Sequence, residues 1–302
     1  MTDAFLSALF LQAGYNATLV SIGAALLGLA TGSVGAFLTL RRRALASDAM
    51  AHATLPGIGL AFLAMAAHGG DGRNLAGLLL GAGLTAALGL FLLQRLTTRT
   101  RLPEDAAIGA VLSTFYGAGI VLLTVIQNLS LGRPAGLEGF LLGSTAGMLL
   151  SDAMLIAGGG AVILLILALL RRPLAMTAFD PDHARQMGVN TRATDTALLL
   201  LTLACVLLGL RVVGLILIVA LLITPALTAR LWSDRIGIVA LLAGGIGAVA
   251  GHLGASLSLA LPDLPTGPSI VLLVFAAFLA SLLLAPGNGL FSRRRRTAPD
   301  PA

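Results

Sequence analysis

The chain has 302 residues, of which 57% are hydrophobic and only 11% are charged, against about 25% charged residues in an average soluble domain. So few polar side chains cannot cover a water-exposed surface, which excludes an ordinary soluble protein and indicates a protein embedded in lipid. All 19 basic residues are arginine. The net charge of +6 therefore comes without any lysine, which excludes a Walker-type ATP-binding loop.

Apolar stretches follow one another along the chain, and a helix that crosses a bilayer needs about 20 apolar residues in a row. We predict spans near residues 15–40, 45–66, 74–94, 106–126, 138–170, 195–210, 212–231, 236–260 and 268–286. The fifth is too long for one straight crossing, so we expect a break near Gly143 to Ser151. Arg211 and its neighbours alone separate the sixth span from the seventh, which predicts a tight hairpin. The predicted fold is an all-α polytopic bundle of about nine spans, within a range of about eight to ten, in a single domain over residues 1–302.

The arginines predict the orientation of these spans. If the N-terminus lies outside, 16 of the 19 arginines fall in cytoplasmic loops or in the tail at residues 291–302. The three exceptions are Arg73, Arg133 and Arg211. Because cytoplasmic loops of membrane proteins carry an excess of arginine and lysine, we expect an external N-terminus and a cytoplasmic C-terminus.

Asp48 and His52 lie within the second predicted span, where ionisable groups are costly and mark function. Residues four apart share one face of a helix, so a carboxylate oxygen and an imidazole nitrogen can both reach one divalent cation. Pro56 has no N–H for the carbonyl of His52, so we expect a kink and a free backbone oxygen beside the pair. The alternative is a local Asp–His hydrogen bond, with Asp48 paired to one of the arginines at 41–43.

The longest polar interval inside the chain, roughly residues 171–194, contains a short predicted helix. Asp180 is a good N-cap, Pro181 suits the first helical position, and Gly188 is a plausible stop after the last turn. A helix of two turns is too short to be stable alone. We expect it either to dock a partner or to lie on the protein's own surface.

Other conspicuous residues have simpler explanations. We expect His252 to be a packing residue, Asp263 to lie in a proline-rich outer turn, His68 and Asp71 to lie in a solvated outer loop, Glu138 and Asp152 to cap helices, and Cys205 to be a small core residue. The alternative for His252, Asp263, His68 and Asp71 is a part in the path of a transported ion. Glycines four apart predict close helix packing within one subunit, at Gly28 and Gly32, Gly77 and Gly81, and Gly247 and Gly251.

Six stretches, in this order along the chain, carry a resemblance to one family: Ser47-Asp48-Ala49 with His52-Ala53 and Leu55-Pro56-Gly57; Ala107-Ile108-Gly109 after Asp105; Leu142-Gly143-Ser144; Phe179-Asp180-Pro181 with Ala184 and Gly188; Val213-Gly214 with Leu221 to Pro225 and Ala229-Arg230; and Leu264-Pro265-Thr266-Gly267-Pro268. Together they cover nearly the whole chain from about residue 15 to 286, and they resemble the membrane permease of bacterial ABC importers for zinc, manganese or chelated iron.

This resemblance implies a multi-pass protein of the bacterial inner membrane that pairs with a second copy of itself. It also implies cytoplasmic ATP-binding subunits and an extracytoplasmic metal-binding protein as partners, no catalytic residues, and no permanently bound cofactor, the transported metal ion being the substrate. Asp48 and His52 match the family's metal-pathway pair. The residues matching its ATPase-coupling helix are Phe179, Asp180, Pro181, Ala184, Arg185 and Gly188. Ala51 departs from the family, where serine is common before the histidine, and this leaves the metal's identity open.

Three other functions remain as alternatives. A secondary transporter driven by an ion gradient also uses broken helices and intramembrane polar groups. A permease for a metal chelate such as a siderophore would have a related fold but no use for the Asp–His pair. An intramembrane hydrolase would need more protein ligands than two for a catalytic zinc. No feature points to nucleic-acid binding, and Asp plus His suits zinc, manganese and iron alike.

Overall fold

The computed structural model describes residues 2–69, 72, 74–129, 148–261 and 264–285, and every regular element among them is a helix. In chain order the helices are α1 (Thr2–Leu9), α2 (Tyr15–Leu40), α3 (Ala44–Ala67), α4 (Leu75–Arg99), α5 (Glu104–Asn128), α7 (Leu150–Phe179), α8 (Pro181–Gln186), α9 (Thr191–Trp232), α10 (Ile236–Ala260) and α11 (Thr266–Leu284). The predicted all-α fold class is therefore confirmed.

Eight helices in the described part of the chain are long and apolar enough to cross a membrane. The bounds of α2 and α10 coincide with the spans predicted at 15–40 and 236–260. The break expected near Gly143 to Ser151 lies largely outside the described residues, and α7 begins at Leu150. Helix α1 was not predicted, because its eight residues are too few to give the hydrophobic signal of a span.

Helix α9 is broken at Gly214. Gly214 has non-helical dihedral angles, with φ 77°, and a shorter apolar helix follows it at Leu217–Trp232. A side-chain carbon on Gly209 would collide with the side chain of Ile218, so these two residues lie in contact. In a straight helix, residues nine positions apart are separated by about 14 Å. The chain therefore folds back between these residues, close to Arg211, where we predicted the boundary between two spans.

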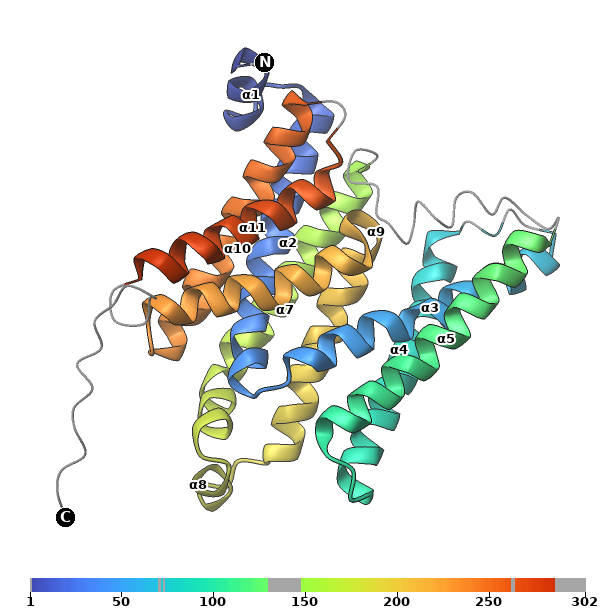
Figure 1. Cartoon of the computed structure of the whole chain (residues 1–302), viewed down its shortest axis with the longest axis vertical. Coiled ribbons are helices and arrows are strands. Elements are labelled where there is room, and N and C mark those ends of the chain that lie inside the picture. Colours follow the sequence, from blue (N-terminus) through green and yellow to red (C-terminus); the bar gives the residue numbers. More distant parts are fainter. Residues whose placement is uncertain (1, 70–71, 73, 130–147, 262–263, 286–302) are drawn as a thin grey trace.

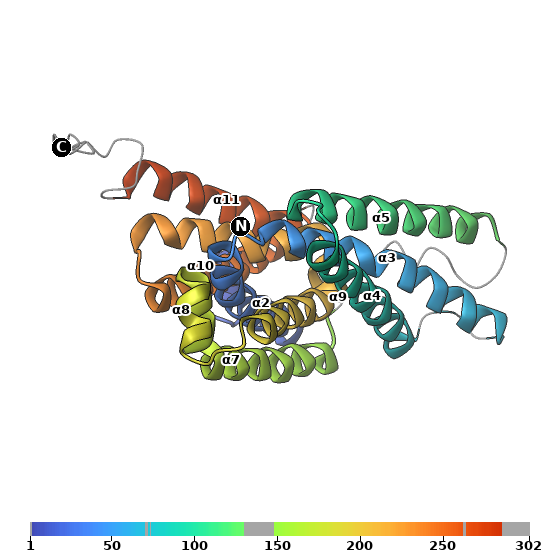
Figure 2. The same ribbon diagram turned by 90° about the horizontal axis from the view of Figure 1, so that it is seen from below.

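The helices form two groups, which Figures 1 and 2 show side by side. We call α3, α4 and α5 the arm, because α3 packs on both other helices. We call α2, α7, α9, α10 and α11 the body, in which α2 packs against α10, α9 and α7. Helix α9 also contacts α3 and α4, so it joins the two groups.

Glycines set the close packing within each group. A side-chain carbon on Gly28 would overlap the backbone of Gly247, and one on Gly57 would overlap the backbone of Gly81. The first contact joins α2 to α10, and the second joins α3 to α4. Gly28, Gly81 and Gly247 therefore pack helices within one chain, as predicted, and Gly57 brings α3 close to α4.

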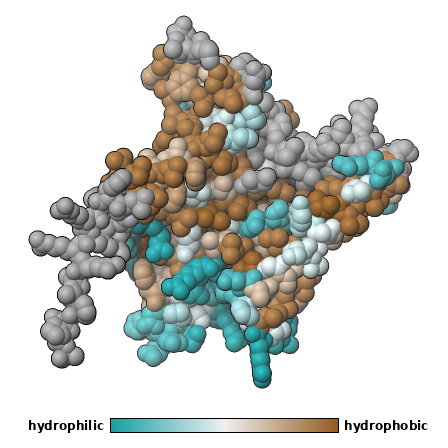
Figure 3. All heavy atoms as spheres, in the orientation of Figure 1, coloured by the Kyte–Doolittle hydropathy of each residue, from teal (hydrophilic) through white to brown (hydrophobic). Residues whose placement is uncertain are grey.

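One end of the molecule is more polar than the rest. In Figure 3 most of the coloured surface of the upper and middle parts is hydrophobic, with smaller hydrophilic patches in the middle and at the right-hand edge, and hydrophilic residues gather at the lower end. In Figure 1 α8 lies at this end and α1 at the opposite end. The hydrophilic end of the bundle is thus the end that carries the short polar helix.

Candidate functional site

Asp48 and His52 lie one turn apart near the start of α3, within a helix of membrane-spanning length. Oδ1 of Asp48 and Nε2 of His52 are 3.4 Å apart. Two metal–ligand bonds of about 2.1 Å at a tetrahedral angle separate their donor atoms by about 3.4 Å. The helix therefore holds a carboxylate and an imidazole at a separation that is compatible with tetrahedral binding of a divalent cation.

The pair is open on one side. The side chain of Asp48 is 37% exposed and that of His52 is 26% exposed. Nδ1 of His52 is buried, and no hydrogen-bond partner for it exists among the described residues. The imidazole is thus anchored by packing, while the edge facing Asp48 remains accessible.

The arginines at 41–43 do not neutralise Asp48. Arg41 binds Asp195 and Arg43 binds Glu104. Within the described ranges the ion-pair contact of Asp48 is with His52 alone. The alternative drawn from the sequence thus holds in one part: the local Asp48–His52 contact is present, at 3.4 Å, whereas the described residues show no ion pair between Asp48 and an arginine.

Tyr116 of α5 completes the surroundings of the pair. Its ring meets that of His52 edge to face, with centroids 5.0 Å apart and an interplanar angle of 81°. Sequence analysis missed this residue, because no local pattern links α5 to α3. The one hint in the sequence is that tyrosine is rare, since the chain has only two tyrosines.

Pro56 does not interrupt α3, which runs continuously from Ala44 to Ala67. A side-chain carbon on Gly119 of α5 would press against Leu55 and the nitrogen of Pro56, so α5 supports the helix at the proline. The carbonyl of His52 still lacks an N–H four residues later. This carbonyl oxygen is a third possible metal ligand on this stretch of α3, after the Asp48 carboxylate and the His52 imidazole.

Helix α8 has the ends that its sequence predicts. Oδ1 of Asp180 accepts hydrogen bonds from the N–H groups of Asp182, at 3.1 Å, and His183, at 2.9 Å. At the other end Gly188 adopts φ 82°, and the N–H of Val189 donates to the carbonyl of Ala184 at 2.9 Å. This is the Schellman arrangement that ends helices at a glycine.

The side chains of α8 divide into a buried anchor and an exposed surface. Ala184 is fully buried, where α8 contacts α7 and α9. Arg185 binds Asp182 at 2.7 Å on the exposed side. Phe179 and Met187, just outside the two ends of α8, are 66% and 65% exposed. The helix therefore presents a polar surface between two exposed apolar side chains.

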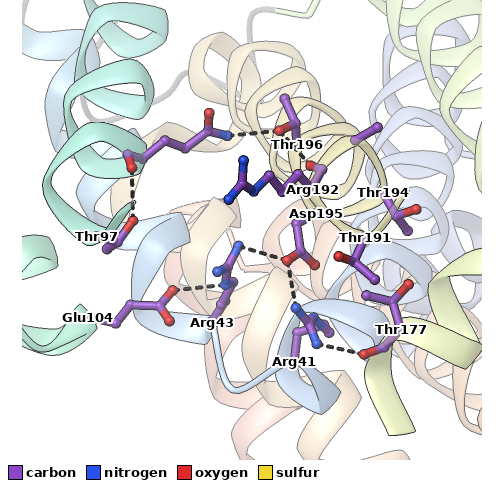
Figure 4. Close-up of polar contacts among 12 residues, drawn as sticks. Arg41, Arg43, Thr97, Glu104, Thr177, Thr191, Arg192, Thr194, Asp195 and Thr196 are labelled. Atoms are coloured by element: carbon purple, nitrogen blue, oxygen red, sulfur yellow. Dashed lines mark hydrogen bonds and ion pairs between the residues drawn. The ribbon is translucent and has the colours of Figure 1, made fainter. Parts of the chain in front are cut away.

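A second polar cluster joins the connection between α2 and α3 to α5, α7 and α9 (Figure 4). Arg41 binds Oδ2 of Asp195 at 2.6 Å and donates to the carbonyl of Thr177 at 2.7 Å. Arg43 binds Glu104 at 2.9 Å and lies 3.7 Å from Asp195. Sequence analysis missed these contacts, because they join residues up to 154 positions apart.

The remaining candidate residues lie away from the Asp48–His52 pair. His252 lies within 3.1 Å of the carbonyl of Leu9 in α1, and His68 contacts the carbonyl of Ala64 at 2.7 Å at the end of α3. Asp152 caps α7 by accepting from the N–H of Leu149 at 3.0 Å. The predictions for Asp71, Asp263 and Glu138 fall outside the described residues, and Cys205 is buried as predicted.

Over the described ranges, no three histidine, cysteine, aspartate or glutamate side chains come together as a metal site. In a single copy of the chain Asp48 and His52 thus offer two side-chain ligands to a metal ion. A resident structural zinc has four ligands, so the arrangement suits an ion that is held briefly.

Comparisons of the sequence with a protein-family model and with individual known proteins agree with one another. Residues 15–285 match the ABC 3 transport family. The chain is 40% identical over 292 residues to the manganese transport system membrane protein MntC of Bacillus subtilis, covering 94% of this chain and 66% of that protein. It is 37% identical over 287 residues to the zinc transport system membrane protein TroC of Treponema pallidum, covering 94% and 95% of the two chains. The chain thus spans slightly under two thirds of MntC and nearly all of TroC.

The fold also matches a solved structure, PsaBC from Streptococcus pneumoniae in complex with Fab. The TM-score is 0.80 at 30% sequence identity, and the match covers 95% of this chain and 98% of that one. These comparisons confirm the resemblance to metal-importer permeases that six short stretches of sequence indicated. The chain therefore belongs to the ABC 3 transport family.

Proposed function

We propose that this chain is the membrane-spanning permease subunit of an ATP-driven importer of divalent metal ions, in the bacterial inner membrane. Family membership and relatives described as manganese and zinc transport proteins support this function. The observation that carries it within the chain is the Asp48–His52 pair, whose donor atoms lie 3.4 Å apart in a membrane-spanning helix. Zinc, manganese and iron all accept this donor set.

The transported ion passes through a site that the chain completes only in part. Asp48 and His52 supply one oxygen and one nitrogen, and the carbonyl of His52, water or a second copy supplies the rest. Structural zinc sites with four protein ligands bind by roughly 10 kcal/mol or more, which would trap the ion. A site with two protein side chains binds less tightly and releases its cargo.

The exposure of the pair supports a homodimer. Ionisable residues in membrane spans face protein or water rather than lipid, yet Asp48 is 37% exposed in a single copy. A second copy that packs against the arm shields the pair and encloses a path between the subunits. An extracytoplasmic metal-binding protein delivers the ion to this path.

Energy comes from separate ATP-binding subunits that dock at α8. The support is the capped, exposed helix between Phe179 and Met187, two apolar side chains that project from the most polar end of the protein. This end is then cytoplasmic and the end with α1 is external, in agreement with the distribution of arginines. The chain acts as one permease domain and carries no ATPase chemistry itself.

The test is metal uptake by the purified permease, its ATP-binding subunits and its delivery protein in sealed liposomes, with zinc, manganese and iron in pairwise competition. We expect uptake that requires ATP and that one of these ions saturates. Uptake driven by an ion gradient without ATP, or transport of a chelate but not of the free ion, would refute the proposal.

A further inference from the structure

The two parts of the proposed mechanism lie on different groups of helices. Asp48 and His52 are on α3 of the arm, whereas α8 joins α7 to α9 of the body. Helices α2 and α3 are consecutive, but α2 packs mainly within the body and α3 within the arm (Figures 1 and 2). Any movement of α8 therefore has to cross from the body to the arm before it reaches the metal pair.

The cluster around Asp195 lies at this crossing (Figure 4). Asp195 is near the start of α9, and Thr177 is near the end of α7, so the two residues flank α8 on both sides. Arg41 holds both of them, through Oδ2 of Asp195 at 2.6 Å and the carbonyl of Thr177 at 2.7 Å. Arg41 thereby fixes the end of α2 to the two helices that carry α8.

Arg43 continues the connection into the arm. It lies 3.7 Å from the same Oδ2 of Asp195 and binds Glu104, the first residue of α5, at 2.9 Å. Arg43 directly precedes α3, five positions before Asp48. The arginine thus joins the starts of α3 and α5, the two helices that meet higher up at His52 and Tyr116.

Backbone geometry and burial make this connection firm. Arg42 adopts φ 57°, a left-handed conformation that is costly for a residue other than glycine. This sharp turn allows the arginines on either side of it to reach one carboxylate. The side chains of Arg41, Asp195 and Arg43 are only 16–20% exposed, so solvent screens their attraction less than it screens an exposed pair.

We propose that Asp195 is a positioning residue that transmits movement of α8 to the metal pair, through Arg41 and Arg43. This inference rests on the proposed function of α8 and of the Asp48–His52 pair. Asp195 does not touch the ion. It keeps the base of α3 and α5 in register with the two helices flanking α8, so that ATP-driven movement of the body changes the position of α3.

The test compares Asp195→Asn with Asp234→Asn in the reconstituted complex. Both changes remove one carboxylate charge, but Asp234 lies in the connection between α9 and α10, is exposed and has no ion pair among the described residues. The measurement is the amount of metal imported per ATP hydrolysed. For Asp195→Asn we expect a decrease of about tenfold, within the usual range for a coupling between two sites, and for Asp234→Asn no change.

A second measurement separates lost transmission from lost folding. Spin labels on cysteines replacing Gln186 and Gly109 report the distance between α8 and the arm; Gln186 is exposed, and a side chain on Gly109 meets open space. In complexes in which only one of the two copies carries the labels, we expect one narrow distance distribution when Asp195 is intact and a broad one in the Asp195→Asn variant. If Asp195→Asn does not assemble, Glu104→Gln tests the same connection from the α5 side.

The outcomes distinguish this inference from the proposed function. If the unmodified complex imports no metal, the proposed function fails first. If it imports metal and Asp195→Asn retains both the normal ratio and the narrow distance distribution, the transmission role alone is wrong. Non-additive effects of Arg41→Gln and Asp195→Asn on the ratio would support direct coupling between the two residues, and additive effects would contradict it.

Discussion

Removal of the N-cap of α8 should lower the amount of metal imported per ATP hydrolysed. Oδ1 of Asp180 accepts two backbone hydrogen bonds, at 3.1 and 2.9 Å, and loss of such a cap costs about 1 kcal/mol. A helix of six residues has little stability of its own to absorb this loss. A change of 1 kcal/mol alters the ratio of ordered to disordered helix by about fivefold.

We therefore expect Asp180→Ala to increase hydrogen exchange about fivefold at the amides of residues 182–186, and to lower metal uptake per ATP hydrolysed. Asp180→Asn is the matched control, because asparagine caps helices as well as aspartate does. The assays are exchange followed by mass spectrometry and uptake by the reconstituted complex. Unchanged exchange in Asp180→Ala would refute the capping argument, and equal defects in both variants would show that the charge matters rather than the cap.

Two further predictions concern orientation and packing. A cysteine replacing His68 should react with a membrane-impermeant thiol reagent added outside intact cells, and one replacing Gln186 should react only after permeabilisation. Both positions are exposed, and the native Cys205 is buried. External labelling at Gln186 would contradict the predicted orientation. Gly81→Ala should lower the thermal unfolding midpoint, because its new methyl group overlaps the backbone of Gly57 and overpacking costs about 1–3 kcal/mol. Gly109→Ala, which meets open space, should not lower it, and equal effects of the two substitutions would contradict the packing argument.

The elements that sequence predicted correctly depend on local signals. Hydrophobic length alone placed α2 and α10, and the Asp180, Pro181 and Gly188 signals placed both ends of α8. The contact between Asp48 and His52 follows from their spacing on one helix. Helix α1 was missed because eight residues carry no signal of a span.

Contacts between distant segments could not be predicted from a single sequence. The pattern of arginines indicated which side of the membrane residues 41–43 occupy, but not that Arg41 binds Asp195 and Arg43 binds Glu104. These partners depend on how α3, α5 and α9 pack. Tyr116 was missed for the same reason, since it reaches His52 only because glycines bring α5 against α3.

The central claim is that a transported metal ion passes Asp48 and His52. Its most direct test is metal uptake per correctly inserted complex for Asp48→Asn and His52→Gln, which replace the carboxylate and the imidazole by neutral amides that bind divalent metal ions more weakly. We predict that both variants assemble with the ATP-binding subunits and the delivery protein but import no metal. Near-normal uptake by either variant, at equal insertion, would contradict the account.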